Sequence, residues 1–423
     1  MNKLYIEFYY ILDDSTMVLN NSFSSCYNLC SNMVAVEIKP DGPDYTLNKL
    51  REILSSGKYD TVYTTIIFSW YAYFIYIVAK EFPQINFIVG GSGAIWLTKI
   101  YPSEKIPILP NFKLSSESLQ SIFPSNFHEK QWGLNLPEMG ENIKNVSVVM
   151  CDTTRSCTWG RCKFCHINHC FSHINTIGDP ILNIIKFLPK ELTNYKNTTI
   201  TMGFPDTTLD ELRELVPIFN YDTRISYIGY LSAIRKNQMD EFKSIISEIK
   251  DPKRISFSIG AEFLSDRMLK YIRKAANLNE YIETINFLQS LNIIIHLNLL
   301  IRLNTLIVDD VKEFTSTLKK IDCSKIHMDL NELCMNTANE KNFEPDFKDC
   351  EKIPVYVPFY PDYPIDSETR IYRNKAISFY YFKITNPTQV RLNDIMEEII
   401  NNAGFIVRKD AYYWSKLLYK KKV

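Results

Sequence analysis

The stretch Ser156-Cys157-Thr158-Trp159-Gly160-Arg161-Cys162-Lys163-Phe164-Cys165 governs the interpretation of this chain, because it gathers three cysteines in one short loop. Three thiolates at this spacing can hold three irons of a [4Fe–4S] cluster and leave the fourth iron open to a small molecule. The same cysteines would form a tetrahedral structural zinc site if His166, His169 or Cys170 supplied a fourth ligand. Zinc knuckles usually come as two pairs, and the chain contains no second Cys-x-x-Cys pair.

Length and composition limit the class of protein. A chain of 423 residues can bury a sizeable core and form two or three domains. Its 48 basic and 48 acidic residues cancel, so no charge pattern indicates binding to nucleic acid. Ten unevenly spaced cysteines in this length do not indicate a disulfide framework. The acidic Glu7 interrupts the apolar run that a signal peptide would need, and we therefore expect a cytoplasmic protein.

One uncharged run, residues 61–79, is long enough to cross a bilayer. Its first half is β-branched and aromatic, whereas its second half has helical character. This change of period predicts a buried strand followed by a buried helix, and no membrane segment.

Residues 1–145 are predicted to form an open α/β domain. The expected strands cover 4–10, 34–38, 61–68 and 85–89, and the expected helices cover 47–56 and 71–81. The last of these strands runs into Gly90-Gly91-Ser92-Gly93. Glycines after a parallel strand allow close approach of a ligand, although a tight turn requires them as well.

Residues 146–343 repeat a strand-then-helix unit, which predicts a partial (β/α)6 barrel with ligands at the carboxyl ends of its strands. The expected strands are 146–150, 199–203, 225–229, 255–260, 292–301 and 326–330. Helices are expected from Asp179-Pro180, from a capping box at 208–211, over 265–274 and over 277–291. Residues 344–423 are predicted to be a small cap, with an irregular proline-rich segment and then helices from Asn393 onward.

The cysteine loop, with Phe164 before its last cysteine, resembles the cluster loop of radical S-adenosylmethionine (SAM) enzymes of the cobalamin-binding branch. The resemblance implies that Cys157, Cys162 and Cys165 hold the cluster and that SAM binds the open iron. It also implies that reduction of the cluster cleaves SAM to a 5′-deoxyadenosyl radical. In this reading the cofactor supplies the chemistry and the protein positions it.

Two further stretches resemble SAM-binding elements of the same superfamily, and one arginine is a candidate by its place at the end of the fifth strand. Gly260-Ala261-Glu262 is similar to its fourth-strand signature, which implies that Glu262 holds SAM, and Ile272-Arg273-Lys274-Ala275 follows where relatives have a lysine–glycine pair. Gly203 and Asp206 stand where relatives bind the methionine amino group, although Asp206 also suits a turn. Arg302 is a candidate for the methionine carboxylate, with a solvated loop arginine as the alternative.

Residues 61–93 resemble a cobalamin-binding domain found in methyltransferases that act on ribosomally made peptides. The likeness implies that Ser69, Gly90, Gly91 and Ser92 contact cobalamin. The Asp-x-His-x-x-Gly sequence that would place a histidine on cobalt is absent from the chain, so a bound cobalamin would lack that ligand. Alternatively, the domain has lost the cofactor and binds substrate.

The expected function is methylation of an unactivated carbon in a peptide or natural product, with flavodoxin or ferredoxin as electron donor. Two alternatives stay open: a radical SAM enzyme that epimerises or cross-links a peptide, and a non-catalytic zinc- or cluster-stabilised binding protein. Cys323, Cys334 and Cys350 follow the fifth strand, where some relatives have an auxiliary cluster, but buried small residues are the simpler interpretation. His296, within an apolar strand, is expected in the interior.

Overall fold

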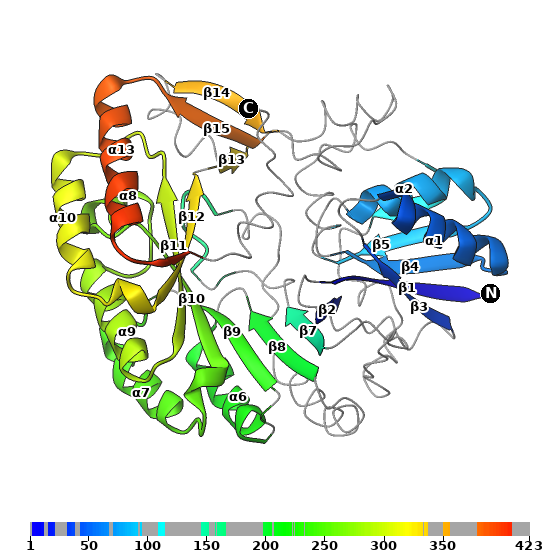
Figure 1. The fold of residues 1–423 in the computed structure, drawn as a ribbon, viewed down its shortest axis with the longest axis horizontal. Helices are drawn as coiled ribbons and strands as arrows, with labels where there is room; N and C mark the ends of the chain where they lie inside the picture. The colour runs from blue at the N-terminus through cyan, green and yellow to red at the C-terminus, as the bar shows by residue number, and fades with distance from the viewer. Residues whose placement is uncertain are drawn as a thin grey trace. The chain divides into compact units, whose positions relative to one another are not determined.

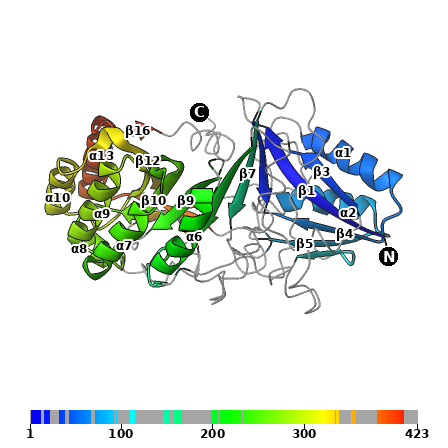
Figure 2. The same cartoon turned by 90° about the horizontal axis from the view of Figure 1, so that it is seen from below.

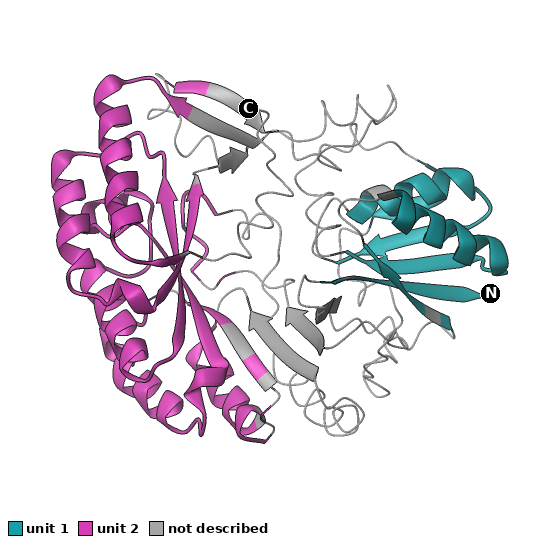
Figure 3. Cartoon of the chain, viewed as in Figure 1, with its two compact units in different colours: residues 1–156, 170–203, 358–376 teal, residues 157–169, 204–357, 377–423 magenta. Residues whose placement is uncertain are grey.

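The structure is a computed structural model. The residues that it describes are 2–11, 16–21, 32–38, 43–66, 71–91, 94, 109–114, 145–151, 157, 159–165, 198–204, 207–221, 223, 225–231, 233–332, 334–336, 350–355 and 379–407. Their contacts divide the chain into two compact units, shown in Figure 3. Unit 1 comprises residues 1–156, 170–203 and 358–376, and unit 2 comprises 157–169, 204–357 and 377–423. The domain boundaries expected at 145 and 343 stay predictions.

Unit 1 is built around a largely parallel sheet (Figure 1). Its elements are β1 (Lys3–Ile11), β2 (Thr16–Asn21), β3 (Asn32–Glu37), α1 (Pro43–Ser56), β4 (Thr61–Thr65), α2 (Ala72–Glu81), β5 (Asn86–Gly90), β6 (Phe112–Leu114), β7 (Asn145–Cys151) and β8 (Thr198–Phe204). β1 pairs in parallel with β3 and β4, and the parallel ladder continues through β5 to β6. The predicted open α/β arrangement is therefore present.

The uncharged run at 61–79 has the predicted change of structure. Every residue of β4 is buried, and α2 follows it. Phe8 of β1 packs edge-on against Tyr71, with ring centroids 5.6 Å apart, and also lies near Phe74 of α2. Among the described residues, no helix combines the length and the apolar character needed to span a bilayer.

β2 is a strand that the sequence analysis did not anticipate. It runs antiparallel to β1 and parallel to β7, and β7 in turn pairs in parallel with β8. The alternation of apolar and polar residues in this short segment is weak, because it ends in Asn20 and Asn21.

In unit 2, a run of parallel strands has helices along one face of the sheet (Figures 1 and 2). Its main elements are α6 (Leu209–Tyr221), β9 (Ile225–Leu231), α7 (Met239–Ser247), β10 (Ile255–Glu262), α8 (Asp266–Tyr271), α9 (Leu278–Ser290), β11 (Ile294–Ile301), α10 (Val308–Leu318), β12 (Ile326–Glu332), α13 (Pro387–Asn402) and β16 (Ile406–Val407). The strands pair in parallel in the order β9, β10, β11, β12, β16. All six strands predicted between 146 and 330 are thus present, as β7 to β12.

The helical face of this sheet carries the core of unit 2. Phe257 of β10 contacts Phe242 of α7, which in turn contacts Phe287 of α9, with ring centroids 6.1 and 5.7 Å apart. Capping residues fix where the helices begin: Asn277 and Glu280 form the predicted reciprocal capping box of α9. The helix expected from Asp179-Pro180 lies outside the described residues.

A three-stranded antiparallel sheet near the predicted cap was not anticipated from the sequence. It consists of β13 (Cys334–Asn336), β15 (Phe379–Ile384) and β14 (Cys350–Val355). The rest of the predicted irregular proline-rich segment, residues 356–378, lies outside the described residues. Pro354 fits in β14 because β14 is an edge strand, where a missing N–H is tolerated. The helix expected from Asn393 begins earlier, at Pro387, because Asn386 accepts hydrogen bonds from the N–H groups of Thr388 and Gln389.

Candidate functional site

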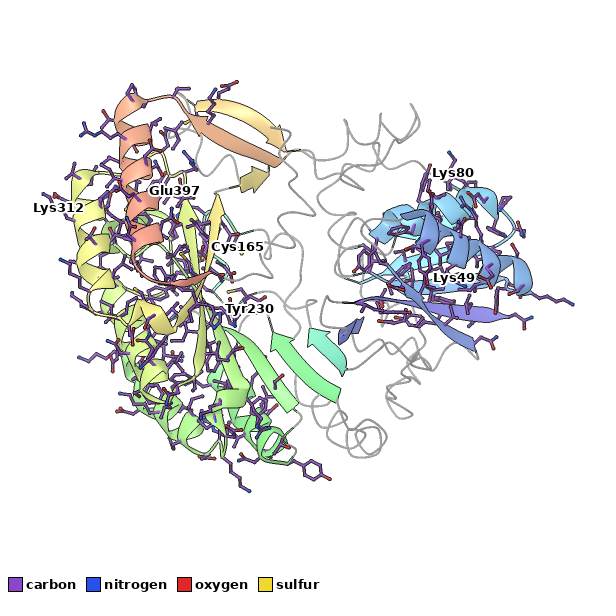
Figure 4. The ribbon with its side chains drawn as sticks, viewed as in Figure 1. Lys49, Lys80, Cys165, Tyr230, Lys312 and Glu397 are labelled. Atoms are coloured by element: carbon purple, nitrogen blue, oxygen red, sulfur yellow. The ribbon has the colours of Figure 1, made fainter. Side chains whose placement is uncertain are left out.

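The three cysteines of the loop lie in unit 2, and each is partly exposed. Figure 4 labels Cys165, which lies beside the strands of that unit. The N–H of Cys165 donates to the carbonyl of Cys162 at 3.2 Å, which gives the second half of the loop a tight turn. Gly160 has a φ of 64°, a backbone conformation that favours glycine.

The loop is attached to the turn that follows α8. The N–H of Lys163 donates to the carbonyl of Ile272 at 3.1 Å, and the indole Nε1 of Trp159 donates to the carbonyl of Arg273 at 2.7 Å. Arg273 itself has a φ of 60°. Two hydrogen bonds from residues on either side of Cys162 therefore hold the cysteine loop against residues 272–274.

The electrostatic surroundings of Cys162 disfavour its thiolate relative to its thiol. Burial raises the pKa of its thiol to about 11, Lys274 acts in the opposite direction, and charge on Cys165 or Cys157 raises the pKa further. Cys162 thus lies close enough to both other cysteines for their charge to act on it, and metal binding would have to remove its proton. Among the described residues, no three His, Cys, Asp or Glu side chains converge on a site for a single metal ion.

Glu262 stands at the carboxyl end of β10, where the pairing with β11 shifts register. Its φ is 63°, and its carboxylate Oε1 lies 3.5 Å from the ammonium Nζ of Lys274. Burial raises the pKa of the Glu262 carboxyl, whereas Lys274 lowers it. Gly260 makes room for this pair, because a Cβ at that position would lie 3.0 Å from Glu262 Oε1 and 3.2 Å from Lys274 Nζ.

The predicted residues Glu262, Phe164 and Cys162 are therefore brought together, and Lys274 lies among them. Its ammonium is 5.7 Å from the centroid of the Phe164 ring. The sequence analysis assigned Lys274 no role, although it occupies the lysine position of the lysine–glycine pair that follows the fourth-strand signature. Its contacts become evident only when the turn after α8 packs on the cysteine loop.

Two other predicted SAM contacts, Arg302 and Gly203, are among the described residues. Arg302, with a φ of 64°, follows β11 and faces α13, where its guanidinium lies 3.4 Å from Glu397 and 3.9 Å from Asp394. Gly203 lies near the end of β8, opposite Cys151, within unit 1. Asp206 lies outside the described residues. The roles expected for Gly203, Asp206 and Arg302 stay predictions.

The predicted cobalamin-contacting residues belong to unit 1. The carbonyl of Gly90 accepts a hydrogen bond from the N–H of Ile66 at 2.9 Å. Gly91 has a φ of 91°, and a Cβ there would lie 2.6 Å from the carbonyl oxygen of Ile66. The lack of a side chain at Gly91 therefore allows this residue to pack closely against the backbone of Ile66. Ser69 and Ser92 lie outside the described residues.

A row of polar side chains crosses the face of the unit 2 sheet that lies opposite the helices. Asn298 donates to the hydroxyl of Ser258 at 2.9 Å. His296 and His327 face each other across β11 and β12, with ring centroids 5.2 Å apart, and Asp329 pairs with Asn298 in register. His296 is 8% exposed, in agreement with the interior position expected from sequence. Sequence alternation within β11 and β12 could have identified this row.

The later cysteines show no shared site among the described residues. Cys323 is buried, and its thiol lies 3.8 Å from the carbonyl of Leu318. Burial raises the pKa of this thiol to about 11. Cys350 and Cys334 belong to β14 and β13 of the small antiparallel sheet. A role for Cys323, Cys334 and Cys350 stays a prediction.

Comparison with known proteins gives a likeness in structure but not in sequence. No family model matches the chain, and no curated protein matches it significantly. The cobalamin-dependent S-adenosylmethionine radical enzyme OxsB, solved with aqua-cobalamin and S-adenosylmethionine bound, is similar with a TM-score of 0.60 and 10% identity, over 95% of this chain and 67% of that chain.

A second similar structure is the radical S-adenosylmethionine methyltransferase TsrM from Kitasatospora setae. With tryptophan substrate and a SAM analogue bound, it matches with a TM-score of 0.60 and 9% identity, over 95% of this chain and 90% of that chain. With cobalamin and a [4Fe–4S] cluster bound, it matches with a TM-score of 0.58. The chain has the fold of these enzymes, so the predicted fold class, a cobalamin-binding-type α/β domain with a radical SAM barrel, is confirmed.

Proposed function

We propose that this chain is a radical SAM enzyme that uses a [4Fe–4S] cluster held by Cys157, Cys162 and Cys165. One observation carries the proposal: the loop of three cysteines is hydrogen-bonded to Ile272 and Arg273, so that Cys162 lies within electrostatic reach of Glu262 at the carboxyl end of β10. Parallel α/β sheets bind ligands at this end of their strands. The fold shared with OxsB and TsrM supports the same conclusion.

The donor set suits such a cluster. Three thiolates from one loop would hold three irons, and an electron delivered to the cluster would cleave the sulfonium of SAM bound at the open iron. On the protein side, Glu262 would orient SAM, and Phe164 would pack beside the cluster. Gly203 and Asp206 are proposed for the methionine amino group. Arg302 would have to leave its acidic partners on α13 to reach the methionine carboxylate.

We further propose that unit 1 binds cobalamin and that the enzyme is a methyltransferase. The likeness to an enzyme whose structure contains aqua-cobalamin supports this, and Ser69, Gly90, Gly91 and Ser92 are the proposed contacts. The substrate would be an unactivated carbon of a peptide or natural product, and flavodoxin or ferredoxin would be the electron donor. Radical SAM modification of a peptide without methyl transfer is the competing function.

The test is anaerobic reconstitution with iron, sulfide and corrinoid. We expect about four irons per chain, and 5′-deoxyadenosine formed when SAM and dithionite are added. The Cys162→Ala variant should lose both, whereas Cys323→Ala, a buried thiol outside the loop, should retain both. Zinc in place of iron in an oxygen-free preparation would contradict the proposal. Deoxyadenosine formed by a protein that binds no corrinoid would favour the competing function.

A further inference from the structure

Lys274 is a buried cation that the proposed function leaves without a role. Its side chain is 8% exposed, and that of its partner Glu262 is 12% exposed. Burying a charged group is costly, and a charge is therefore kept in the interior where it has a partner or a task. The position of Lys274 is fixed by its backbone, because its N–H donates to the carbonyl of Leu269 at 2.9 Å and the two preceding carbonyls hold the cysteine loop.

The charges around Cys162 have opposing effects. Among the described groups that act on this sulfur, the Lys274 ammonium favours negative charge, whereas Cys165, Cys157 and Glu262 disfavour it. Gly260, which has no side chain, leaves the Lys274 ammonium and the Glu262 carboxylate side by side above β10. Charges act more strongly here than at the surface, because little water lies between them.

We propose that Lys274 raises the reduction potential of the cluster held by Cys157, Cys162 and Cys165, and that Glu262 opposes it. The inference rests on the proposed function. Reduction adds one electron to the cluster, taken from a low-potential iron–sulfur or flavin carrier, and Lys274 gains and loses nothing in this step. Its positive charge stabilises the more negative reduced cluster, and the negative charge of Glu262 destabilises that state.

A purely structural ion pair would behave differently. If Lys274 served only to neutralise Glu262, then substitution of either residue would break the same ion pair and disturb the same turn after α8. The two substitutions would then have similar effects. The electrostatic role instead predicts opposite changes for the two substitutions. The sign of the change in reduction potential therefore separates the two roles, without any measurement of enzyme activity.

The experiment is a redox titration, followed by electron paramagnetic resonance, of the full-length reconstituted protein without SAM. For Lys274→Met we expect the one-electron reduction equilibrium constant to fall about tenfold, which corresponds to about 59 mV toward more negative potential. Glu262→Gln should shift the potential toward less negative values, and the double variant should lie between the two. Lys274→Arg should stay near the wild type.

Lys163→Met is the matched control, because Lys163 is another lysine of this region whose ammonium lies over the Tyr271 ring, at 3.9 Å from its centroid. We expect less than a threefold change in its reduction equilibrium constant, roughly, because this partly exposed charge is screened by water. Shifts of the same sign for Lys274→Met and Glu262→Gln would overturn the inference. An unchanged potential in Glu262→Gln would overturn it as well, even if Lys274→Met failed to fold.

Failure of the inference and failure of the proposed function remain distinguishable. If the wild-type chain assembles a cluster that is reduced and cleaves SAM, while the potentials of the variants stay unchanged, the function stands and only the role of Lys274 is wrong. If the wild-type chain assembles no iron–sulfur cluster, the proposed function fails, and the inference fails with it.

Discussion

At the scale of single residues, the chain places ionisable groups inside both of its units. The Glu262–Lys274 pair lies in unit 2, and in unit 1 the carboxyl group of Glu7, on β1, is 2% exposed. The hydroxyl of Tyr5 donates to Glu7 at 2.8 Å and also contacts the Thr65 hydroxyl of β4. Neutral Glu7 costs far less to bury than a carboxylate, and we therefore expect the folded protein to hold its proton at neutral pH.

This proton makes the stability of unit 1 dependent on pH. Burial raises the pKa of Glu7 from 4.5 to about 8, although the hydrogen bond from Tyr5 opposes the shift. Between these values the folded protein binds a proton that the unfolded chain has released. The stabilising contribution is therefore complete below about pH 4.5 and is lost as the pH rises to about 8.

For Glu7→Gln we expect the unfolding midpoint relative to wild type to be higher at pH 8 than at pH 5. The difference in unfolding free energy between the Glu7→Gln variant and the wild type should change by at most about 1.4 kcal/mol per pH unit. Thermal unfolding at the two pH values measures it. Glu52→Gln, whose side chain is 69% exposed on α1, is the control and should follow the wild type. An equal effect of Glu7→Gln at both pH values would show that Glu7 is charged in the folded state.

At the scale of helices and strands, α13 is attached to unit 2 through two side-chain amides. Asn393 accepts from the N–H of Leu303 at 3.1 Å and donates to its carbonyl at 2.9 Å. Gln389 does the same with Leu306, at 2.9 and 2.8 Å. Each side-chain amide supplies the donor and the acceptor that the backbone of a neighbouring strand would otherwise have provided to this loop.

We expect Asn393→Ala to lower the free energy of unfolding of unit 2 by about 1–3 kcal/mol, because both polar groups of Leu303 would be left buried without partners. Asn401→Ala, on an exposed position of the same helix, should change it by less than about 0.5 kcal/mol. Chemical denaturation compares the two variants, and limited proteolysis should detect release of α13. Equal stability of the two variants would show that Asn393 contributes no net hydrogen bonding.

The helices and strands differ in how well they could be predicted from the sequence. The strands β4, β10 and β11 are rich in β-branched and apolar residues and are largely buried, and Ser265 caps the helix that follows β10, so local pattern alone predicted them. The strands β13, β14 and β15 pair across long stretches of sequence and include Pro354, so no local pattern identified them. The three cysteines and Glu262 were predicted from short motifs, whereas Lys274 was not, because its contacts depend on how two separate segments pack.

At the scale of the whole molecule, the proposed cofactor sites belong to different units. The cysteines, Phe164 and Glu262 lie in unit 2, whereas Gly90 and Gly91 lie in unit 1. Each unit contains parallel strands and buried apolar residues of its own. A change confined to the cysteine loop should therefore leave the fold of unit 1 intact.

We expect a full-length variant with Cys157, Cys162 and Cys165 all changed to alanine to lose its iron while it still binds hydroxocobalamin. The affinity for the corrinoid should stay within about threefold of the wild type, since no contact proposed for cobalamin is altered. Equilibrium dialysis with absorbance detection measures it. Wild-type protein that binds the corrinoid only when iron is present would contradict this independence.

The short strand β16 makes the chain sensitive to truncation before residue 406. It pairs in parallel with β12 at His327 and Met328, and α13 leads directly into it. Removal of residues 385–423 would leave part of the backbone of β12 without that neighbour. It would also remove the buried side chains of α13, such as Met396 and Ile400, and uncover the parts of α10 and β11 that this helix contacts. An uncovered strand of this kind recruits other chains, and such a truncated protein should accumulate as insoluble aggregates in place of a smaller working enzyme.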